Sequence, residues 1–225
     1  MIQIAINPVY KTAAPHLRIL AIVADVENPP TDDALWAELE SLAADIRDKF
    51  GDEILEINKI PSIAATRAAY KALGKDPNRY RPSAEALCRR AAKGLSLYRT
   101  LTVIDVINAI SMMSGYSIGG FDADKIEGDL LTLGVGQEGE PYEAIGRGPM
   151  NIAGLPVYRD AVGGIGTPTS DHERTKLSPD TRRLLMIINA YDGDEDNICH
   201  ALDATRQMLT KYAFSTNIEI KEYKI

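Results

Sequence analysis

Residues 103–122 read VIDVINAISMMSGYSIGGFD, an apolar stretch in which Asp105, Asn108 and Ser111 recur at three-residue intervals. This spacing keeps the three side chains within one arc of a helix, while apolar side chains cover the rest of its circumference. A helix that is apolar on nearly all sides is usually buried. Its polar stripe therefore either bonds to neighbouring backbone groups or faces a wet cavity, and both interpretations stay open at this point.

The pattern on either side of this helix predicts the order of the other elements. A Val- and Ile-rich strand is expected over 16–26, and amphipathic or alanine-rich helices over 31–50, 62–73 and 82–94. Short strands separated by Gly and Pro follow over 128–136, 142–146, 154–160 and 182–189, before a helix at 194–212 and a strand at 217–225. Helices first and strands later favour an α+β fold over a regular βαβ repeat. No repeat or long linker divides the chain, so a single domain over 1–225 is predicted.

The composition limits the classes of protein. The chain has 225 residues, of which 45% are hydrophobic, enough for a large core. No segment reaches the ~18–20 apolar residues of a membrane span, and MIQIAINPVY at the start lacks the features of a signal peptide, so a cytoplasmic protein without membrane contact is expected. Cys88 and Cys199 are far apart and lack metal-type spacing, which predicts neither a disulfide nor a zinc site. No metal or other cofactor is expected.

Charge is distributed unevenly along the chain. The net charge is −7, which argues against a general nucleic-acid coat protein. Residues 62–100 nevertheless carry nine basic and two acidic side chains, so the rest of the chain sums to −14. Two interpretations stay open: one face could bind a polyanion such as RNA, or the charges could belong to a solvated helix face.

Two short motifs resemble known binding loops but lack the necessary context. GVGQEG at 134–139 matches the glycine spacing of a dinucleotide loop, yet no helix follows and two nearby glutamates would repel a pyrophosphate. DGDEDN at 192–197 resembles the start of a calcium loop, but Asn197 stands where glycine is needed and Asp203 where a bidentate Glu belongs. We interpret the first as a strand connection and the second as the acidic start of a helix.

A polar loop after the flexible VGGIG carries many candidate ligand-binding groups. The sequence GTPTSDHERT at 166–175 includes Ser170, Asp171, His172 and Thr175 within six positions. Such a density of donors and acceptors could bind a polar ligand, or the loop could cap itself at the surface. His16, His172 and His200 have no ligand-type spacing among them.

Three segments together resemble a known family. They are RYRPSAEALCRR at 79–90, VIDVINAISMMSGYSIGGFDADKIEGD at 103–129 and GGIGTPTSDHERTKL at 163–177. The chain resembles, over roughly 60–212, the tRNA-editing domain in the beta subunit of bacterial phenylalanyl-tRNA synthetase, and more closely its free-standing relatives. The resemblance implies a β-barrel-like core with packed helices and a pocket for the aminoacylated 3′ end of a tRNA. In the synthetase that pocket hydrolyses the ester of a wrongly attached tyrosine.

The resemblance also assigns individual positions. Asn108 falls on an asparagine of the editing pocket, whereas Gly119 stands where synthetase members carry a histidine. A late acidic residue that recognises the tyrosine hydroxyl aligns near Asn189. These differences leave the amino-acid specificity open, and the machinery that charges tRNA is not visible.

The leading hypothesis is thus a free-standing deacylase acting on mischarged tRNA. An aminoacyl ester is already activated, so a positioned water and hydrogen bonds to the oxyanion could suffice without a covalent nucleophile. The expected catalytic residues are Asn108, Ser170, Asp171, His172 and Thr175. The expected substrate-binding residues are Asp105, Gly119, Gly163, Gly164, Arg174 and Asn189, with backbone N–H groups near Gly163 as oxyanion donors. The expected tRNA-binding residues are Arg67, Arg79, Arg81, Arg89 and Arg90. The alternatives are a non-catalytic tRNA- or RNA-binding module and a protein that binds a free amino acid or a similar metabolite.

Overall fold

A four-stranded sheet in the order β10-β2-β9-β3 runs through the middle of the molecule, in a computed structural model that describes residues 2–225. Its strands are β2 (Arg18–Asp25), β3 (Ser117–Asp122), β9 (Arg183–Ala190) and β10 (Thr216–Lys224), and all neighbouring pairs are antiparallel. β2 and β9 occupy the two central positions. These two strands, the most apolar in the sequence, are therefore paired with a neighbouring strand along both edges.

Side chains of β2 alternate between two separate cores. Leu20 and Ile22 pack in the core on the helical side, whereas Ile19, Ala21 and Val23 pack in the core on the opposite side. Successive residues of a strand point to opposite faces, so a strand covered on both faces reads as a nearly continuous apolar run. This explains why 16–26 shows no alternation of polar and apolar residues.

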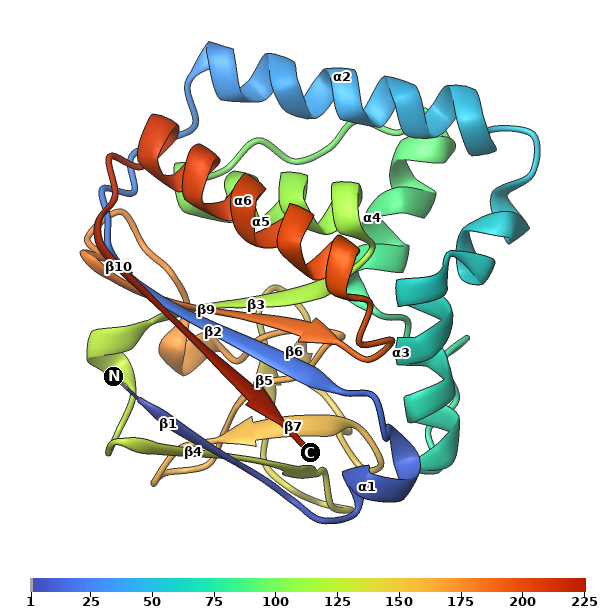
Figure 1. Ribbon diagram of the computed structural model, residues 1–225, viewed down its shortest axis with the longest axis vertical. Coiled ribbons are helices and arrows are strands. Elements are labelled where there is room, and N and C mark those ends of the chain that lie inside the picture. Colours follow the sequence, from blue (N-terminus) through green and yellow to red (C-terminus); the bar gives the residue numbers. More distant parts are fainter. Residues whose placement is uncertain (1) are drawn as a thin grey trace.

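Helices cover one face of this sheet (Figure 1). α2 (Asp33–Phe50), α5 (Thr102–Ser114) and α6 (Glu195–Tyr212) form this layer, and α4 (Ser83–Ala92) packs against α2 and α5. α5 is buried over most of its surface, as its apolar composition predicts. It ends at Gly115, whose φ of 72° is a left-handed conformation that favours glycine.

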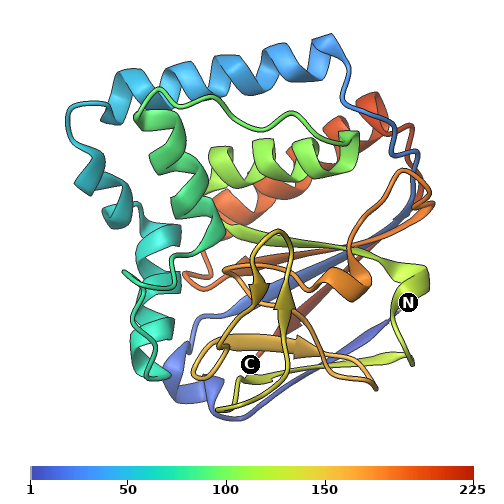
Figure 2. The same cartoon turned by 180° about the vertical axis from the view of Figure 1, so that it is seen from behind.

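A second four-stranded sheet, in the order β1-β4-β7-β8, covers the other face. It consists of β1 (Gln3–Ile6), β4 (Leu130–Val135), β7 (Pro156–Arg159) and β8 (Gly164–Gly166). A short hairpin of β5 (Glu143–Ala144) and β6 (Gly148–Pro149) rises from this sheet towards the helical layer (Figure 2). The remaining elements are α1 (Tyr10–Ala13), α3 (Pro61–Ala72) and the 3-10 turns η1 (Ile54–Lys59), η2 (Ala123–Lys125) and η3 (Glu173–Thr175).

The predicted α+β class is confirmed, and every helix predicted from the sequence is present. The strands form two stacked sheets that do not close into a barrel within residues 2–225. The strands β1, β3, β6 and β8 are not predicted from the sequence. β3 carries two glycines and β8 has only three residues, so neither has the apolar run that identifies a strand.

Candidate functional site

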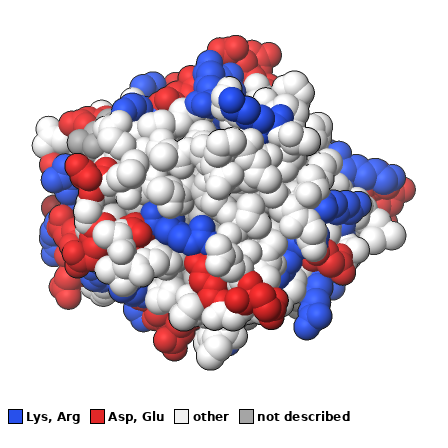
Figure 3. Space-filling view, turned by 90° about the horizontal axis from the view of Figure 1, so that it is seen from below, with Lys and Arg blue, Asp and Glu red and all other residues white. Residues whose placement is uncertain are grey.

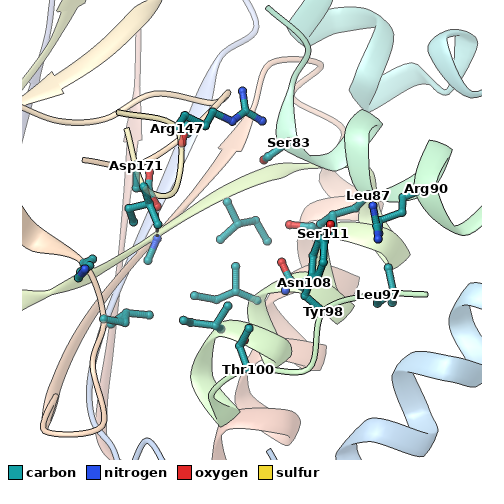
Figure 4. A pocket seen from close by; sticks show the side chains of 18 residues that line it. Ser83, Leu87, Arg90, Leu97, Tyr98, Thr100, Asn108, Ser111, Arg147 and Asp171 are labelled. Carbon is teal, nitrogen blue, oxygen red and sulfur yellow. Dashed lines mark hydrogen bonds between the residues drawn. The ribbon is translucent and has the colours of Figure 1, made fainter. Parts of the chain in front are cut away.

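A pocket of about 470 Å³ opens between the helical layer and the loops of the second sheet. α4, α5 and the segment 97–100 line one side, β3 contributes Ile118 and Gly120, and the β5–β6 hairpin and residues 170–177 line the other side. Figure 4 shows Asp171 and Arg147 on one side, opposite Asn108, Ser111 and Tyr98. Apolar side chains, Ile104, Ile107 and Leu177 among them, also line the pocket. It can accept an uncharged apolar group flanked by polar ones.

The polar stripe of α5 divides into a structural part and a pocket-lining part. Asp105 is fully buried and accepts hydrogen bonds from the Thr31 hydroxyl at 2.5 Å and the Thr100 backbone N–H at 2.9 Å. Asn108 and Ser111 line the pocket instead, and the Asn108 amide donates to Asp105 at 3.4 Å. Asp105 thus fixes the chain before α5 and orients Asn108, and it does not line the pocket itself.

Asp171 is the carboxylate of the pocket. Burial raises the pKa of Asp171 to about 7, against the opposing effect of the Gly120 backbone N–H, which donates to Oδ2 at 3.1 Å. The backbone oxygen of Asp171 also accepts from the N–H of Ile145, which ties the loop to the β5–β6 hairpin. A carboxyl group that titrates near neutral pH in a pocket is suited to accepting a proton.

The space beside Gly119 is occupied by two other side chains. A Cβ atom added at Gly119 would lie 2.7 Å from the Phe121 ring and 3.4 Å from Oδ1 of Asp171. At Gly166 an added Cβ would lie 2.5 Å from the same ring and 2.9 Å from the same oxygen. The two glycines therefore leave room for Phe121 and for the Asp171 carboxylate, and the Cβ atom of a histidine at position 119 would collide with the Phe121 ring and touch the carboxylate.

Ser170 and Asp171 line the pocket, but the residues that follow them in the polar loop, 172–175, do not. Arg174 donates to Oδ1 of Asp160 at 2.8 Å and to a backbone oxygen of Lys125. Thr175 is fully buried, and its hydroxyl has no hydrogen-bond partner within residues 2–225. Neither side chain lines the pocket: Arg174 binds groups outside it, and Thr175 is enclosed by the protein.

His172 begins the turn η3 and packs under the hairpin. Its Nδ1 accepts from the Arg174 backbone N–H at 2.9 Å, and its ring meets the Tyr142 ring edge-on at 5.0 Å. Burial, and to a lesser degree the Arg174 charge, lowers the pKa of His172. The lowered pKa favours the neutral imidazole. The ring packs behind the wall of the pocket and does not line it.

Three further predicted substrate-binding residues also lie outside the pocket lining. Gly163 donates its N–H to Oδ1 of Asp160 at 3.1 Å, so this N–H is already occupied as a hydrogen-bond donor. Gly164 packs against the Tyr142 ring. Asn189 is buried between the sheets, where its side chain accepts from the Tyr158 hydroxyl at 2.7 Å and donates to the Ser117 backbone oxygen.

Most of the predicted tRNA-binding arginines surround one buried carboxylate. Arg67 and Arg89 each approach Glu85 at 2.7 Å, and Arg81 approaches it at 3.4 Å, while Glu85 has no exposed surface. Arg79 lies near the Tyr80 ring, and only Arg90 reaches the pocket. The face of the molecule in Figure 3 carries charges of both signs around a largely uncharged centre.

The structure adds pocket residues that the sequence analysis did not single out. They are Ser83, Tyr98, Thr100, Arg147 and Lys176. Arg147 lies between two glycines with positive φ angles, in the sequence GRG of the hairpin. The sequence GRG does indicate an exposed arginine on a tight turn. However, each strand of this hairpin has only two residues, so the sequence gives no pattern that would place Arg147 opposite α4 and α5.

The described residues hold no group of three or more His, Cys, Asp or Glu side chains arranged for a metal ion. Within residues 2–225 no helix has the length and apolarity needed to cross a bilayer.

Fold and pocket together define an α+β protein with a pocket of mixed polar and apolar lining. Residues 65–213 match the model of the B3/4 domain. The chain therefore belongs to the B3/4 domain family, and the resemblance to the beta subunit of phenylalanyl-tRNA synthetase is confirmed.

Among the solved structures that match this chain is an N-terminal fragment of the phenylalanyl-tRNA synthetase beta subunit from Pyrococcus horikoshii, with 14% sequence identity and a TM-score of 0.46. The alignment covers 97% of this chain and 50% of the fragment, so the chain spans about half of the fragment's length. A comparison with curated protein sequences finds no match.

Proposed function

We propose that this protein binds the aminoacylated 3′ end of a tRNA and hydrolyses the ester of a mischarged amino acid in trans. The observation that carries the proposal is the position of Asp171, which faces Asn108 across the pocket (Figure 4). Membership of the B3/4 family supports an aminoacyl ester as the ligand. Of the five candidate catalytic residues from the sequence, Asn108, Ser170 and Asp171 line this pocket, and among these three only Asp171 carries a carboxyl group that can accept a proton.

The size and lining of the pocket suit such an end group. A volume of about 470 Å³ lies within the range of small-molecule sites and has room for an aminoacyl group on a ribose. The apolar lining favours an uncharged, apolar amino-acid side chain. Arg90, Arg147 and Lys176 give the lining three cationic side chains, which suits a phosphate-bearing ligand.

The chemistry requires one general base and one hydrogen-bond donor. In its ionised form Asp171 takes a proton from a water, whose oxygen attacks the ester carbonyl carbon. The Asn108 amide N–H donates to the carbonyl oxygen as negative charge develops there. The bond from the carbonyl carbon to the 3′ oxygen then breaks, and the leaving oxygen receives the proton from Asp171. The products are a free amino acid and a 3′ hydroxyl, with no covalent enzyme intermediate.

The histidine missing at position 119 fits this assignment. The Asp171 carboxylate lies next to the site where a side chain at 119 would begin, with 3.4 Å between Oδ1 and the added Cβ. We infer that Asp171 supplies in this chain the polar group that the synthetase family supplies from position 119. The absence of the histidine therefore does not remove the base from the pocket.

A panel of correctly and incorrectly charged tRNAs tests the proposal. The purified protein is incubated with each, and loss of the aminoacyl ester is followed against a sample without protein. We expect selective loss from one mischarged pair, and at least about a hundredfold lower kcat in Asp171→Asn, because a general base contributes that much or more. Asp180→Asn, the same change at an exposed position outside the pocket lining, is the control.

Two results would contradict the proposal. If no charged tRNA lost its amino acid while tRNA still bound, the protein would be a non-catalytic tRNA-binding module. If Asn108→Ala and Asp171→Asn both deacylated at the wild-type rate, the reaction would take place elsewhere in the chain.

A further inference from the structure

One aromatic side chain of the pocket is held in an exposed position. Tyr98 is 70% exposed and lines the mouth of the pocket. The Arg90 guanidinium lies 4.2 Å from the centre of its ring, and Arg90 Nε donates to the Ser96 backbone oxygen at 2.7 Å. A cation thus covers one face of the ring at a fixed place, while much of the ring stays accessible.

The segment that carries Tyr98 is fixed on the other side as well. The Thr100 backbone N–H donates to Asp105, and the Arg99 guanidinium donates to the Thr31 backbone oxygen at 2.7 Å. These bonds anchor the chain on both sides of Tyr98, so little conformational entropy remains to be lost when a ligand packs against the ring. An exposed aromatic residue on an anchored loop is typical of a binding platform rather than of a hydrophobic core.

Arg147 lines the same pocket from the opposite side (Figure 4). Its backbone N–H is bonded to the Ala144 oxygen at 3.0 Å, which fixes the turn. Its guanidinium is exposed and makes no hydrogen bond or ion pair with other residues in the described part of the chain. All five of its N–H donors are therefore available for an anion.

We propose that Tyr98, backed by Arg90, stacks against the base of a nucleotide and that Arg147 binds the phosphate of the same nucleotide. The ligand class is a nucleoside 5′-phosphate, and its source is the terminal adenosine of a tRNA, an assignment that rests on the proposed function. Bases stack on aromatic side chains regardless of sequence, and arginine pairs with phosphate through two parallel hydrogen bonds. The apolar part of the pocket then remains free for the amino acid.

Equilibrium binding of adenosine and of adenosine 5′-monophosphate separates the two contacts. Tyr98→Ala is expected to weaken both ligands about tenfold, because it removes the stacking surface. Tyr98→Phe keeps the ring and is expected to bind both as the wild type does. Arg147→Ala is expected to weaken only the monophosphate, so that its advantage over adenosine disappears. Arg206→Ala, an exposed arginine on α6, is the matched control.

Two tRNAs distinguish the source of the nucleotide. An uncharged tRNA with its terminal adenosine is compared with the same tRNA lacking it, in wild type and in Tyr98→Ala. We expect the intact tRNA to bind more tightly to the wild type and the difference to vanish in Tyr98→Ala. Equal binding of both tRNAs by the wild type would overturn the assignment to the tRNA end and leave a site for free nucleotides.

This inference and the proposed function fail in different ways. If deacylation occurs and Tyr98→Ala changes neither nucleotide affinity nor the KM for charged tRNA, the stacking platform is wrong and the deacylase stands. If no charged tRNA is hydrolysed while both nucleotide contacts and the tRNA difference are found, the platform stands and the proposed hydrolysis is wrong.

Discussion

The Arg67 guanidinium lies 2.7 Å from the Glu85 carboxylate, which has no exposed surface at all. Arg89 reaches the other oxygen of the same carboxylate at 2.7 Å, from one turn further along α4. Arg67 belongs to α3, so the pair joins two consecutive helices across the loop between them. A buried charge is tolerated only when it is paired and hydrogen-bonded, and here two arginines meet that need.

Glu85→Ala is expected to destabilise the protein by about 3–5 kcal/mol, because Arg67 and Arg89 would remain partly buried without their partner. The free energy of unfolding, measured by urea denaturation, checks this. Glu56→Ala is the control: Glu56 pairs with Lys59 at 2.6 Å, but both side chains are solvent-exposed, so its loss is expected to cost at most about 1 kcal/mol. Similar losses in the two variants would mean that the Glu85 cluster is not a stabilising centre.

This cluster also shows why the basic segment could not be interpreted from the sequence. Nine basic residues within 62–100 are consistent with an RNA-binding surface, but the count contains no information about pairing. Arg67 and Arg89 donate to Glu85, so mutating them to test RNA binding would destabilise the fold as well as change the surface. Arg147, which the sequence analysis passed over, is a better probe because its guanidinium is available.

The fold could be predicted from the sequence more completely than the site, for a physical reason. Helices such as 31–50 and the strand pair at 16–26 and 182–189 follow from local patterns of apolar residues. The pocket instead depends on which segments meet in space: α5, which carries Asn108, packs against β3, and Asp171 of the polar loop accepts a hydrogen bond from Gly120 of the same strand. Asn108 was a candidate from the sequence because it lies on the polar stripe of an apolar helix and matches the family resemblance, and Asp171 because it lies in a dense polar loop.

Asp105→Ala is expected to lower stability and to weaken ligand binding together. Asp105 accepts from Thr31, from two groups of Thr100 and from Asn108, and its removal would leave these donors without a partner. A loss of about 3 kcal/mol in the free energy of unfolding is expected, since several hydrogen bonds to one buried carboxyl group are lost. Asp105→Asn keeps the shape and is expected to lose less. Nucleotide affinity should fall in Asp105→Ala, because the segment carrying Tyr98 loses its anchor at Thr100; unchanged affinity would contradict this coupling.

Gly120→Ala tests the pocket from the strand that lines it. An added Cβ would lie 2.5 Å from Cδ1 of Ile107 and 3.1 Å from Cδ1 of Leu177, the mobile ends of two pocket side chains. These ends can shift, so we expect a loss of about 1 kcal/mol in stability but clearly weaker ligand binding as they move into the cavity. Gly136→Ala is the matched comparison, because its Cβ would lie 2.0 Å from the backbone oxygen of Ile152. Backbone cannot move aside as a side chain does, so a loss of about 3 kcal/mol is expected there, with little effect on the pocket.

Asp171→Asn is expected to stabilise the protein while it removes activity. The pKa of Asp171 is raised by burial to about 7 in the folded state, well above that of an aspartate in an unfolded chain. The folded state therefore binds more protons than the unfolded state between about pH 4 and 7, so stability falls as pH rises across this interval and stays lower above it.

An uncharged amide at position 171 removes this loss of stability at higher pH, and its oxygen still accepts a hydrogen bond from the Gly120 N–H. We expect Asp171→Asn to be more stable than the wild type by about 1–3 kcal/mol at pH 8 and nearly equal to it at pH 4, where the carboxyl is protonated in the fold. Urea denaturation of both proteins at the two pH values checks this.

The same titration predicts the pH dependence of the proposed hydrolysis. Only the ionised carboxylate accepts a proton from water, so kcat/KM should rise with pH to about 7 and level off above it. A stability difference that does not depend on pH would mean that Asp171 has an ordinary pKa, and the predicted rise of kcat/KM up to about pH 7 would then be absent or would come from another residue.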